Sequence, residues 1–412
     1  MKLKTNDFKD INEGNVIEFI DFIIRNAIEE KVSDIHIDSG FENILIRYRI
    51  DGDLFTFMEF PKKCESIIFT RVKILAGMDI AQKRISQDGR IDFYFEERKV
   101  DLRISTLPLI TGEKVVIRIL DSVNLKIDFE NLGFFEEDLP VVRKLISKNT
   151  GVLIICGPTG CGKSTTLNSI LNEIKSEKEN LITIENPVEL KIKGANQIQV
   201  NEKAGITFSK MLRAVLRNDP DYIMIGEMRD SETAEIAIRS AITGHKVFST
   251  LHNRDNYSAV ARLIDMGIKP YLISCALGGV ITQRLIKKLC DKCKKKVQIS
   301  DKDRLFINQF ADLGTDYIYE PAGCDCCNNG YLGRMPVFEI LEIDENIISI
   351  INNDFRVSTL RDYGENQLKV KTMFQKAVIQ AINGNTSLEE VRKLLEDIFA
   401  ASHQRAFRKK CA

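Results

Sequence analysis

The chain lacks tryptophan entirely and contains only four histidines in 412 residues. It also lacks a net charge, because 59 basic residues balance 59 acidic ones, so its overall charge favours neither nucleic acid nor a membrane surface as a partner. No apolar stretch approaches the ~20 residues that a membrane-spanning helix needs. The polar start MKLKTNDFKD has no apolar segment of the kind found in secretory signals. We therefore expect a cytoplasmic protein whose contact with a membrane is at most peripheral.

Cysteine is present, but its distribution does not suggest a framework of disulfides. Two of the ten cysteines lie in or beside a glycine-rich loop at 157–165, and five cluster between positions 290 and 327. This arrangement fits a reducing compartment and a metal site.

Hydrophobic residues make up 44% of the chain, enough for a sizeable core, and the length suggests two or three domains. Behind a polar tail at 1–13, the segment 14–120 predicts a small α+β domain. Helical spacing of apolar residues predicts a helix at 17–30 and a second around 63–76. Alternating apolar residues predict strands at SDIHID, ILIRYRIDG, RIDFYF, KVDLRIS and EKVVIRIL.

Two Asp-Gly pairs predict turns between these strands, at Asp51-Gly52 and at Asp88-Gly89. Residues 121–131 then have the composition of a linker.

Beyond the linker, apolar strands alternate with helical segments, which is typical of an α/β domain with a parallel sheet. We assign this domain to 132–340. It includes a lysine-rich and cysteine-rich segment at 284–334, and a helical region at 341–412 follows, ending in the basic sequence HQRAFRKK.

The strongest motif is GPTGCGKST, which matches the P-loop pattern G-x-x-x-x-G-K-[ST] between an apolar run and a helical stretch. Glycines allow backbone N–H groups to turn toward phosphates, Lys163 reaches the β and γ oxygens, and Ser164 ligates Mg²⁺. A glycine-rich turn with a purely structural role would not need Lys-Ser at this spacing. The expected nucleotide-binding residues are Gly157, Pro158, Thr159, Gly160, Cys161, Gly162, Lys163, Ser164 and Thr165.

Hydrolysis also needs carboxylates near the phosphates. The apolar run in DYIMIGEMRD ends at Glu227, and ITIENPVEL supplies Glu185 and Glu189 after another such run. Acids at the carboxyl ends of parallel strands lie over the nucleotide in this architecture, so one can hold Mg²⁺ and another can orient water. Each acid could instead cap the helix that follows it, and for Glu185 the two interpretations stay open.

Two of the four histidines fall in TGHKVFSTLH, as His245 and His252. An imidazole at a strand end could contact the γ-phosphate, but a single histidine is more often structural, and the residues alone leave both interpretations open.

Taken together, an ordered set of segments from about residue 16 to 395 resembles the secretion ATPases of type II secretion systems and type IV pili. The segments are SDIHI, QDGRID, RISTLP, GEKVVIRIL, GPTGCGKSTT, IENPVE, QVNEKAGITF, LRNDPDYIMIGEMRD and TGHKVFSTLH.

This resemblance implies a small PAS-like N-terminal domain and a RecA-like ATPase domain, assembled as a homo-hexamer. It implies that Lys163 and Ser164 form the Walker A site and that Glu227 is the Walker B acid, a Mg²⁺ ligand. Glu189 matches the general base, and His245 and His252 match the His box, which implies catalysis for His252 and nucleotide binding for His245.

The resemblance also assigns Arg103 and Arg118, and less directly Arg90, to the N-terminal arginines that reach the triphosphate. Taken alone, each would be an exposed cross-strand charge. Whether they act within their own chain or on a neighbour stays open.

Two departures from the family pattern stand out. Asn186 occupies a position where the family usually has aspartate, which weakens a catalytic role there. The leading domain that many of these ATPases carry before the PAS-like domain is not expected here. Docking to a cytoplasmic adaptor through that domain is therefore not expected either.

The late cysteines form two Cys-x-x-Cys pairs, and four thiolates suit tetrahedral Zn²⁺. The intervening 30 residues exceed the common zinc-ribbon spacing, so unliganded cysteines remain an alternative, and Cys326 could replace Cys327. The segment resembles the four-cysteine segment of assembly-type ATPases, which implies a structural site. Its ligands would be Cys290, Cys293, Cys324 and Cys327.

Six lysines lie between Lys287 and Lys296. They could form a docking surface for an acidic partner or anionic lipid headgroups, or simply a solvated loop.

The resulting hypothesis is a Mg²⁺-dependent ATPase, with ATP, Mg²⁺ and Zn²⁺ as cofactors, that powers extension of a type IV pilus or a secretion pseudopilus. The resemblance implies an inner-membrane platform protein as its partner. The alternatives are a retraction motor, which the cysteine pairs disfavour, a nucleic-acid motor and a scaffold without turnover. A nucleic-acid motor predicts a basic stripe and stacking aromatic residues, so we expect no direct binding to nucleic acid.

Overall fold

The computed structural model describes residues 8, 11–121, 127–311, 314–353, 355–368 and 370–398. The chain divides into two compact units, residues 1–125 and 126–412. The boundary lies within the segment that the sequence indicates as a linker, of which 122–126 is outside the described residues, as is the basic sequence HQRAFRKK.

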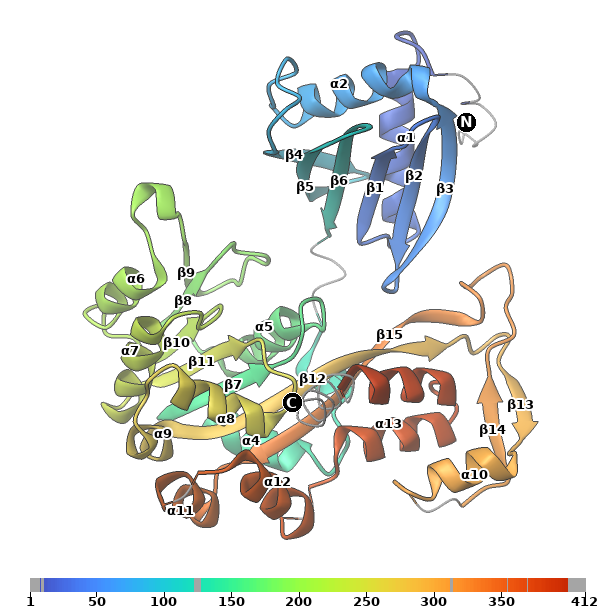
Figure 1. Cartoon of the computed structure of the whole chain (residues 1–412). Coiled ribbons are helices and arrows are strands. Elements are labelled where there is room, and N and C mark those ends of the chain that lie inside the picture. Colours follow the sequence, from blue (N-terminus) through green and yellow to red (C-terminus); the bar gives the residue numbers. More distant parts are fainter. Residues whose placement is uncertain are drawn as a thin grey trace, which may run out of the picture. The chain divides into compact units, whose positions relative to one another are not determined.

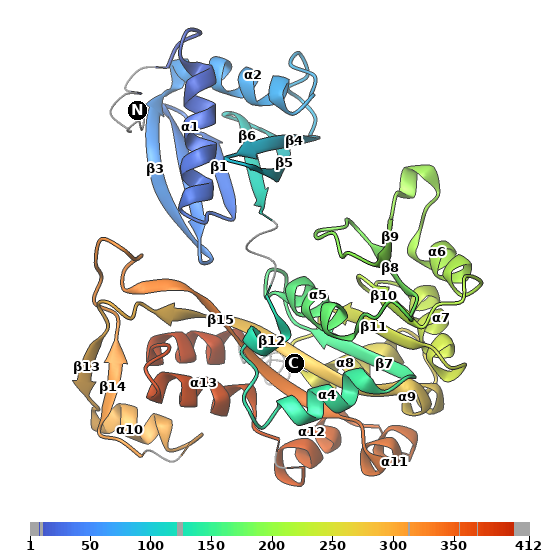
Figure 2. The same ribbon diagram turned by 180° about the vertical axis from the view of Figure 1, so that it is seen from behind.

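The first unit is a six-stranded antiparallel sheet in the order β3-β2-β1-β6-β5-β4. Helix α1 crosses one face of this sheet, which is the rear face in Figure 1 and the front face in Figure 2, and α2 packs beside α1. The elements are α1 (Val16–Glu29), β1 (Asp34–Ser39), β2 (Asn43–Ile50), β3 (Asp53–Pro61), the 3₁₀ turn η2 (Lys62–Cys64), α2 (Glu65–Leu75), β4 (Gln87–Phe95), β5 (Arg98–Leu109) and β6 (Gly112–Leu120).

The core of this unit follows from the strand alternation in the sequence. On β1, Ile35 and Ile37 are fully buried, whereas His36 and Asp38 between and after them are only half-buried. A buried ion pair helps to fasten α2 to the sheet: the Lys73 ammonium lies 2.6 Å from the Glu113 carboxylate of β6, and both side chains are nearly inaccessible. Removing one partner of such a pair costs ~3–5 kcal/mol, because the other charge stays buried.

The turn expected at Asp51-Gly52 is confirmed, with φ values of 52° and 98°. The turn expected at Asp88-Gly89 is wrong, because both residues lie inside β4 and pair with β5. Glycine is needed at position 89 for another reason: a Cβ there would lie 2.5 Å from the carbonyl oxygen of Ala76. Strand β3 does not follow from the sequence pattern, because its side chains do not alternate cleanly between buried and exposed.

The second unit contains a seven-stranded mixed sheet in the order β15-β12-β7-β11-β10-β8-β9, in which only β15 runs antiparallel to its neighbour. The strands are β7 (Gly151–Cys156), β8 (Leu181–Glu185), β9 (Ala195–Gln199), β10 (Tyr222–Ile225), β11 (Lys246–Leu251), β12 (Leu277–Leu289) and β15 (Tyr331–Glu342). The expected parallel sheet is therefore present, with an added antiparallel edge strand.

Helices cover both faces of this sheet (Figures 1 and 2). One apolar core contains residues of α4 and α5, and another contains residues of α6 to α9. The helices and 3₁₀ turns here are η3 (Phe129–Asn131), α4 (Leu139–Ser147), α5 (Lys163–Ile174), η4 (Glu202–Ala204), α6 (Phe208–Val215), α7 (Ser231–Ile242), α8 (Asn256–Asp265) and α9 (Pro270–Ala276).

A small module, which contains the cysteine pairs, extends from β12 and β15 (Figure 1). It consists of β13 (Lys295–Gln298), α10 (Asp301–Ile307) and β14 (Tyr317–Glu320), with β13 and β14 forming a two-stranded sheet. The chain then continues with α11 (Glu345–Asn353), α12 (Val357–Asn366), α13 (Met373–Ile382) and helical residues 388–398. Among the helices described, none combines the length and apolar character needed to cross a bilayer.

Candidate nucleotide site and cysteine cluster

The P-loop motif forms the connection between β7 and α5, at the carboxyl edge of the sheet. Three of its glycines have left-handed or otherwise positive φ values: 153° at Gly157, 76° at Gly160 and 90° at Gly162. Side chains other than glycine rarely adopt these values, so the motif's glycines are required by the backbone path. A loop turned in this way presents successive backbone N–H groups to an anion, and the N-terminus of α5 adds a favourable dipole.

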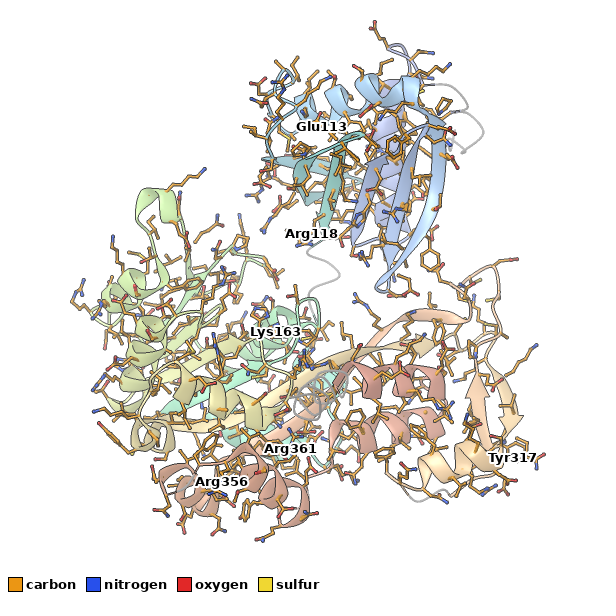
Figure 3. The ribbon with its side chains drawn as sticks, in the orientation of Figure 1. Glu113, Arg118, Lys163, Tyr317, Arg356 and Arg361 are labelled. Carbon is orange, nitrogen blue, oxygen red and sulfur yellow. The ribbon has the colours of Figure 1, made fainter. Side chains whose placement is uncertain are left out.

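Lys163 is the first residue of α5 and is buried within the loop (Figure 3). Its ammonium donates hydrogen bonds to the carbonyl oxygens of Gly157, at 2.8 Å, and Pro158, at 2.9 Å. Burial lowers the pKa of Lys163, and the negative charge of Glu227 acts in the opposite direction. The next side chain, Ser164, is exposed at the start of the helix, where its hydroxyl is accessible to a bound cation.

Glu227 follows β10 by two residues and lies at this same edge. One of its carboxylate oxygens is 2.5 Å from the Arg229 guanidinium and the other is 3.3 Å from Nε2 of His252. His252 comes directly after β11, the strand between β10 and the P-loop strand β7. The fold therefore brings Lys163, Glu227 and His252 to one edge of the sheet. The negatively charged carboxylate oxygens of Glu227 are ligands of the kind that suits Mg²⁺.

The two glutamates after β8 differ in their surroundings. Glu185 is buried and accepts hydrogen bonds from the Thr183 hydroxyl, at 2.6 Å, and from the Gln197 amide, at 3.0 Å. Burial raises the pKa of Glu185. Glu189 is exposed four residues later. Glu185 therefore caps none of the helices described, since β9 follows β8 and its partners lie on these two strands, and the carboxylate accessible to water is that of Glu189.

His245 does not join this group within the chain. It precedes β11 and lies half-buried at the opposite edge of the sheet, where its Nδ1 is 3.0 Å from the carbonyl oxygen of Ser240. The six residues of β11 separate it from His252, and the seven residue steps between the two histidines span ~23 Å at ~3.3 Å per residue. His252 therefore lies beside Glu227, and His245 lies at the other end of β11.

Gln283 and Arg284 of β12 are neighbours of the P-loop that the sequence analysis missed. The Gln283 amide donates to the carbonyl oxygen of Cys161 and accepts from the Thr166 hydroxyl, both at 2.8 Å. The buried Arg284 guanidinium donates to the carbonyl oxygens of Gln283, at 3.0 Å, and Arg254, at 2.9 Å. An isolated Gln-Arg pair at the end of an apolar run carries no recognised signal, so only the fold reveals these contacts.

In the first unit, Arg90, Arg103 and Arg118 lie opposite one another on three neighbouring strands. Arg90 of β4 pairs in register with Arg103 of β5, which pairs with Arg118 of β6 (Figure 3 labels Arg118). The antiparallel sheet thus brings together the three arginines that the family resemblance singled out.

Cys290, Cys293, Cys324 and Cys327 converge, with all four sulfur atoms within 4.8 Å of one another. Individual Sγ–Sγ distances are 3.9 Å, 3.6 Å and 3.5 Å. Four sulfurs at the Zn–S distance of ~2.3 Å lie about 3.8 Å apart in a regular tetrahedron, so the cluster fits zinc. Cys326 is exposed and lies 3.5 Å from the Lys292 ammonium, outside the cluster.

Comparisons with known proteins agree with this geometry. A type II secretion system ATPase E of Vibrio cholerae is 39% identical over 389 residues, which cover 94% of this chain and 76% of the relative. The type IV pilus assembly ATPase PilB of Thermus thermophilus is 40% identical over 385 residues, covering 93% of this chain and 43% of that protein. The X-ray structure of the Legionella pneumophila ATPase DotB shares the fold, with a TM-score of 0.69 at 19% identity, covering 92% of this chain and 96% of DotB.

The sequence model described as "Type II/IV secretion system protein" matches residues 9–393, which includes both units and the cysteine cluster. The chain therefore belongs to the type II/IV secretion system protein family, as a homologue of type II secretion ATPase E and the pilus assembly ATPase PilB.

Proposed function

We propose that this protein is a Mg²⁺-dependent ATPase that drives the extension of a type IV pilus or a secretion pseudopilus. The observation that carries the proposal is the convergence of Lys163, Glu227 and His252 at one edge of the sheet, beside a P-loop whose glycines hold positive φ values. A phosphate-binding loop alone would support binding, whereas the acid on a neighbouring strand supports turnover.

Each residue has a defined task in this proposal. Lys163 and the loop N–H groups bind the β- and γ-phosphates, and Ser164 and Glu227 would hold Mg²⁺, which neutralises charge on the phosphate oxygens when bound. Glu189, exposed near this edge, orients and deprotonates the attacking water. His252, hydrogen-bonded to Glu227, positions that carboxylate.

Positive charge for the γ-phosphate comes from the first unit, through Arg103 and Arg118. Phosphoryl transfer concentrates negative charge on the γ-phosphate oxygens, and the P-loop stabilises only part of it. Arginine guanidinium groups are well suited to stabilise the remaining negative charge. The support for this role is the shared position of both arginines on one sheet and the family resemblance of RISTLP and GEKVVIRIL.

At the level of assembly, we propose a homo-hexamer of chains, each with a PAS-like first unit and a RecA-like second unit. The partner that receives the motion would be an inner-membrane platform protein, reached from the cytoplasmic face. The four-cysteine cluster would hold a structural zinc ion, as in assembly-type rather than retraction-type motors.

The test is ATP turnover by the purified protein with and without Mg²⁺. We expect Lys163→Ala to lose nucleotide binding and Glu227→Gln to keep it while turnover falls by roughly 10²–10³-fold, a typical effect of removing one electrostatic contact to the transition state. Glu235→Gln is the matched control, because Glu235 is an exposed residue of α7 paired only with Arg239 among the described contacts. Equal turnover by Glu227→Gln and the wild type would remove Glu227 from the mechanism.

A further inference from the structure

The arginines of the first unit belong to a continuous row of charged side chains across the sheet. Arg118 of β6 pairs in register with Asp34 of β1, and Asp34 pairs on its other side with Arg49 of β2. Together with Arg90 and Arg103, these residues make one row through five adjacent strands. The row contains a single carboxylate, Asp34, next to Arg118.

Asp34 accepts a hydrogen bond from one nitrogen of Arg118, its Nε. The Nε–H of Arg118 donates to Oδ1 of Asp34 at 2.9 Å, and the Asp34 side chain is mostly buried whereas that of Arg118 is 62% exposed. The other carboxylate oxygen, Oδ2, accepts a hydrogen bond from the Ser33 hydroxyl at 2.9 Å, which fixes the carboxylate in turn. Within the described part of the chain, this contact with Asp34 is the one recorded for the Arg118 side chain, so its Nη1 and Nη2 groups face solvent.

Arg90 is held in a different way. Its Nε and Nη2 groups both donate to Asp101, at 2.6 Å and 2.8 Å, so the carboxylate occupies the Nε–Nη2 edge of this guanidinium. A guanidinium can bind phosphate through two of its N–H groups at once. Arg90 shares one Nη group with Asp101, whereas Arg118 is held through Nε alone, so both Nη groups of Arg118 keep all their N–H donors for an anion.

We propose that Asp34 is a positioning residue that holds Arg118 by Nε and thereby presents its Nη1–Nη2 fork to the terminal phosphate of a bound nucleotide. This inference rests on the proposed function and refines it. Arg118 is the arginine with both Nη groups available for phosphate, while Arg90 shares one of its Nη groups with Asp101. Arginine in a fixed orientation loses less conformational freedom when it binds, so removing the holder weakens the contact that Arg118 makes in the transition state.

The experiment compares kcat and KM for MgATP in the full-length protein carrying Asp34→Ala, Arg118→Ala or both. We expect Asp34→Ala to lower kcat about tenfold with KM within about twofold, a coupling typical of residues in direct contact. The double variant should match Arg118→Ala alone, because Asp34 acts only through Arg118. Asp92→Ala is the control: Asp92 pairs with Lys99 at 2.7 Å on the same sheet but outside the row.

Asp34→Asn addresses the case in which the alanine variant does not fold. Asparagine keeps an oxygen that accepts from Nε, so kcat should stay within about threefold of the wild type. If Asp34→Asn loses as much kcat as Arg118→Ala, the inference is overturned. Additive effects of Asp34→Ala and Arg118→Ala in the double variant would overturn it as well. Full turnover in Arg118→Ala would instead contradict the proposed role of Arg118 itself, so the two failures are distinguishable.

Discussion

At the scale of single residues, the P-loop is shaped by β12 as well as by its own sequence. A Cβ at Gly157 would lie 2.5 Å from the Gln283 carbonyl oxygen, and one at Gly162 would lie 2.8 Å from the Gln283 amide nitrogen. The same amide donates to the carbonyl oxygen of Cys161. Glycine is thus required at both positions for two reasons: the positive φ values, and the close approach of Gln283. Gln283 fixes the loop from the neighbouring strand β12.

We predict that Gln283→Leu raises KM for ATP about tenfold. The substitution leaves the Cys161 carbonyl and the Thr166 hydroxyl without partners, and a lost pair of hydrogen bonds in a buried place costs ~1–3 kcal/mol. Isothermal titration with a non-hydrolysable ATP analogue measures the effect on binding.

Gln283→Glu separates shape from hydrogen bonding. It keeps an acceptor for Thr166 but turns the donor toward Cys161 into a second acceptor, so it should also weaken binding. Gln298→Leu, in the exposed part of β13, is the control. Unchanged affinity in both Gln283 variants would show that the loop keeps its shape without this contact.

Residues with a local motif could be predicted from the sequence, and residues placed by long-range packing could not. Lys163 and Ser164 follow from the spacing of the P-loop, and Glu227 from its place after an apolar strand. Gln283 contacts Thr166 across 117 positions of sequence, so no local sequence pattern predicts this contact. His245 and His252 share one sequence motif, and the six residues of β11 place them at opposite ends of that strand.

At the scale of elements, strand alternation predicted most of the first unit because one face of its sheet is covered by helices and the other is not. The pattern failed at β3, an edge strand whose apolar side chains range from the exposed Leu54 to the buried Phe60. The Asp-Gly turn signal failed at Gly89, where a close approach to Ala76 rather than a turn requires glycine. In the second unit, burial on both faces gave continuous apolar runs, which indicated parallel strands but not the antiparallel β15.

The cysteine module is the element whose stability should depend most on a ligand. Two short turns present the thiols, with the Cys293 N–H bonded to the Cys290 carbonyl and the Cys327 N–H to the Cys324 carbonyl, both at 3.2 Å. Among the residues described between the two turns, the regular elements are the two-stranded β13–β14 sheet and the short helix α10. A metal that joins the two turns would close a long loop and add folding free energy to a module with few strands of its own.

We predict about one zinc ion per chain, released by Cys290→Ser or Cys324→Ser and retained by Cys326→Ser. Release should increase hydrogen exchange in the 284–334 segment while the P-loop strand stays protected. Plasma emission spectrometry of freshly purified reduced protein measures the metal. Zinc-free wild-type protein would refute the site, and loss of zinc in Cys326→Ser would reassign the fourth ligand.

At the scale of the whole molecule, the proposed chemistry divides between two units joined by a short segment. Phosphate binding and the acids belong to the second unit, and the arginines belong to the first. A charge delivered on a separate unit stabilises the transition state only when the units come together, so hydrolysis and movement become coupled. The sequence indicated this division through its change from alternating strands to alternating strands and helices. It could not indicate which chain's nucleotide each arginine serves, because that depends on assembly.

The last prediction concerns this division of labour. Arg103→Ala and Arg118→Ala should fold, because each arginine alternates with buried apolar neighbours that stay in place, such as Leu102 and Ile117. Arginines delivered to a γ-phosphate contribute ~10³–10⁵ in rate, so turnover should fall far more than nucleotide affinity. Mixing Arg118→Ala with Lys163→Ala subunits then identifies the recipient: activity recovered above that of either variant means that the arginine serves a neighbour's nucleotide, and no recovery means that it serves its own chain. Near-wild-type turnover in both arginine variants would show that the first unit is not part of the active site.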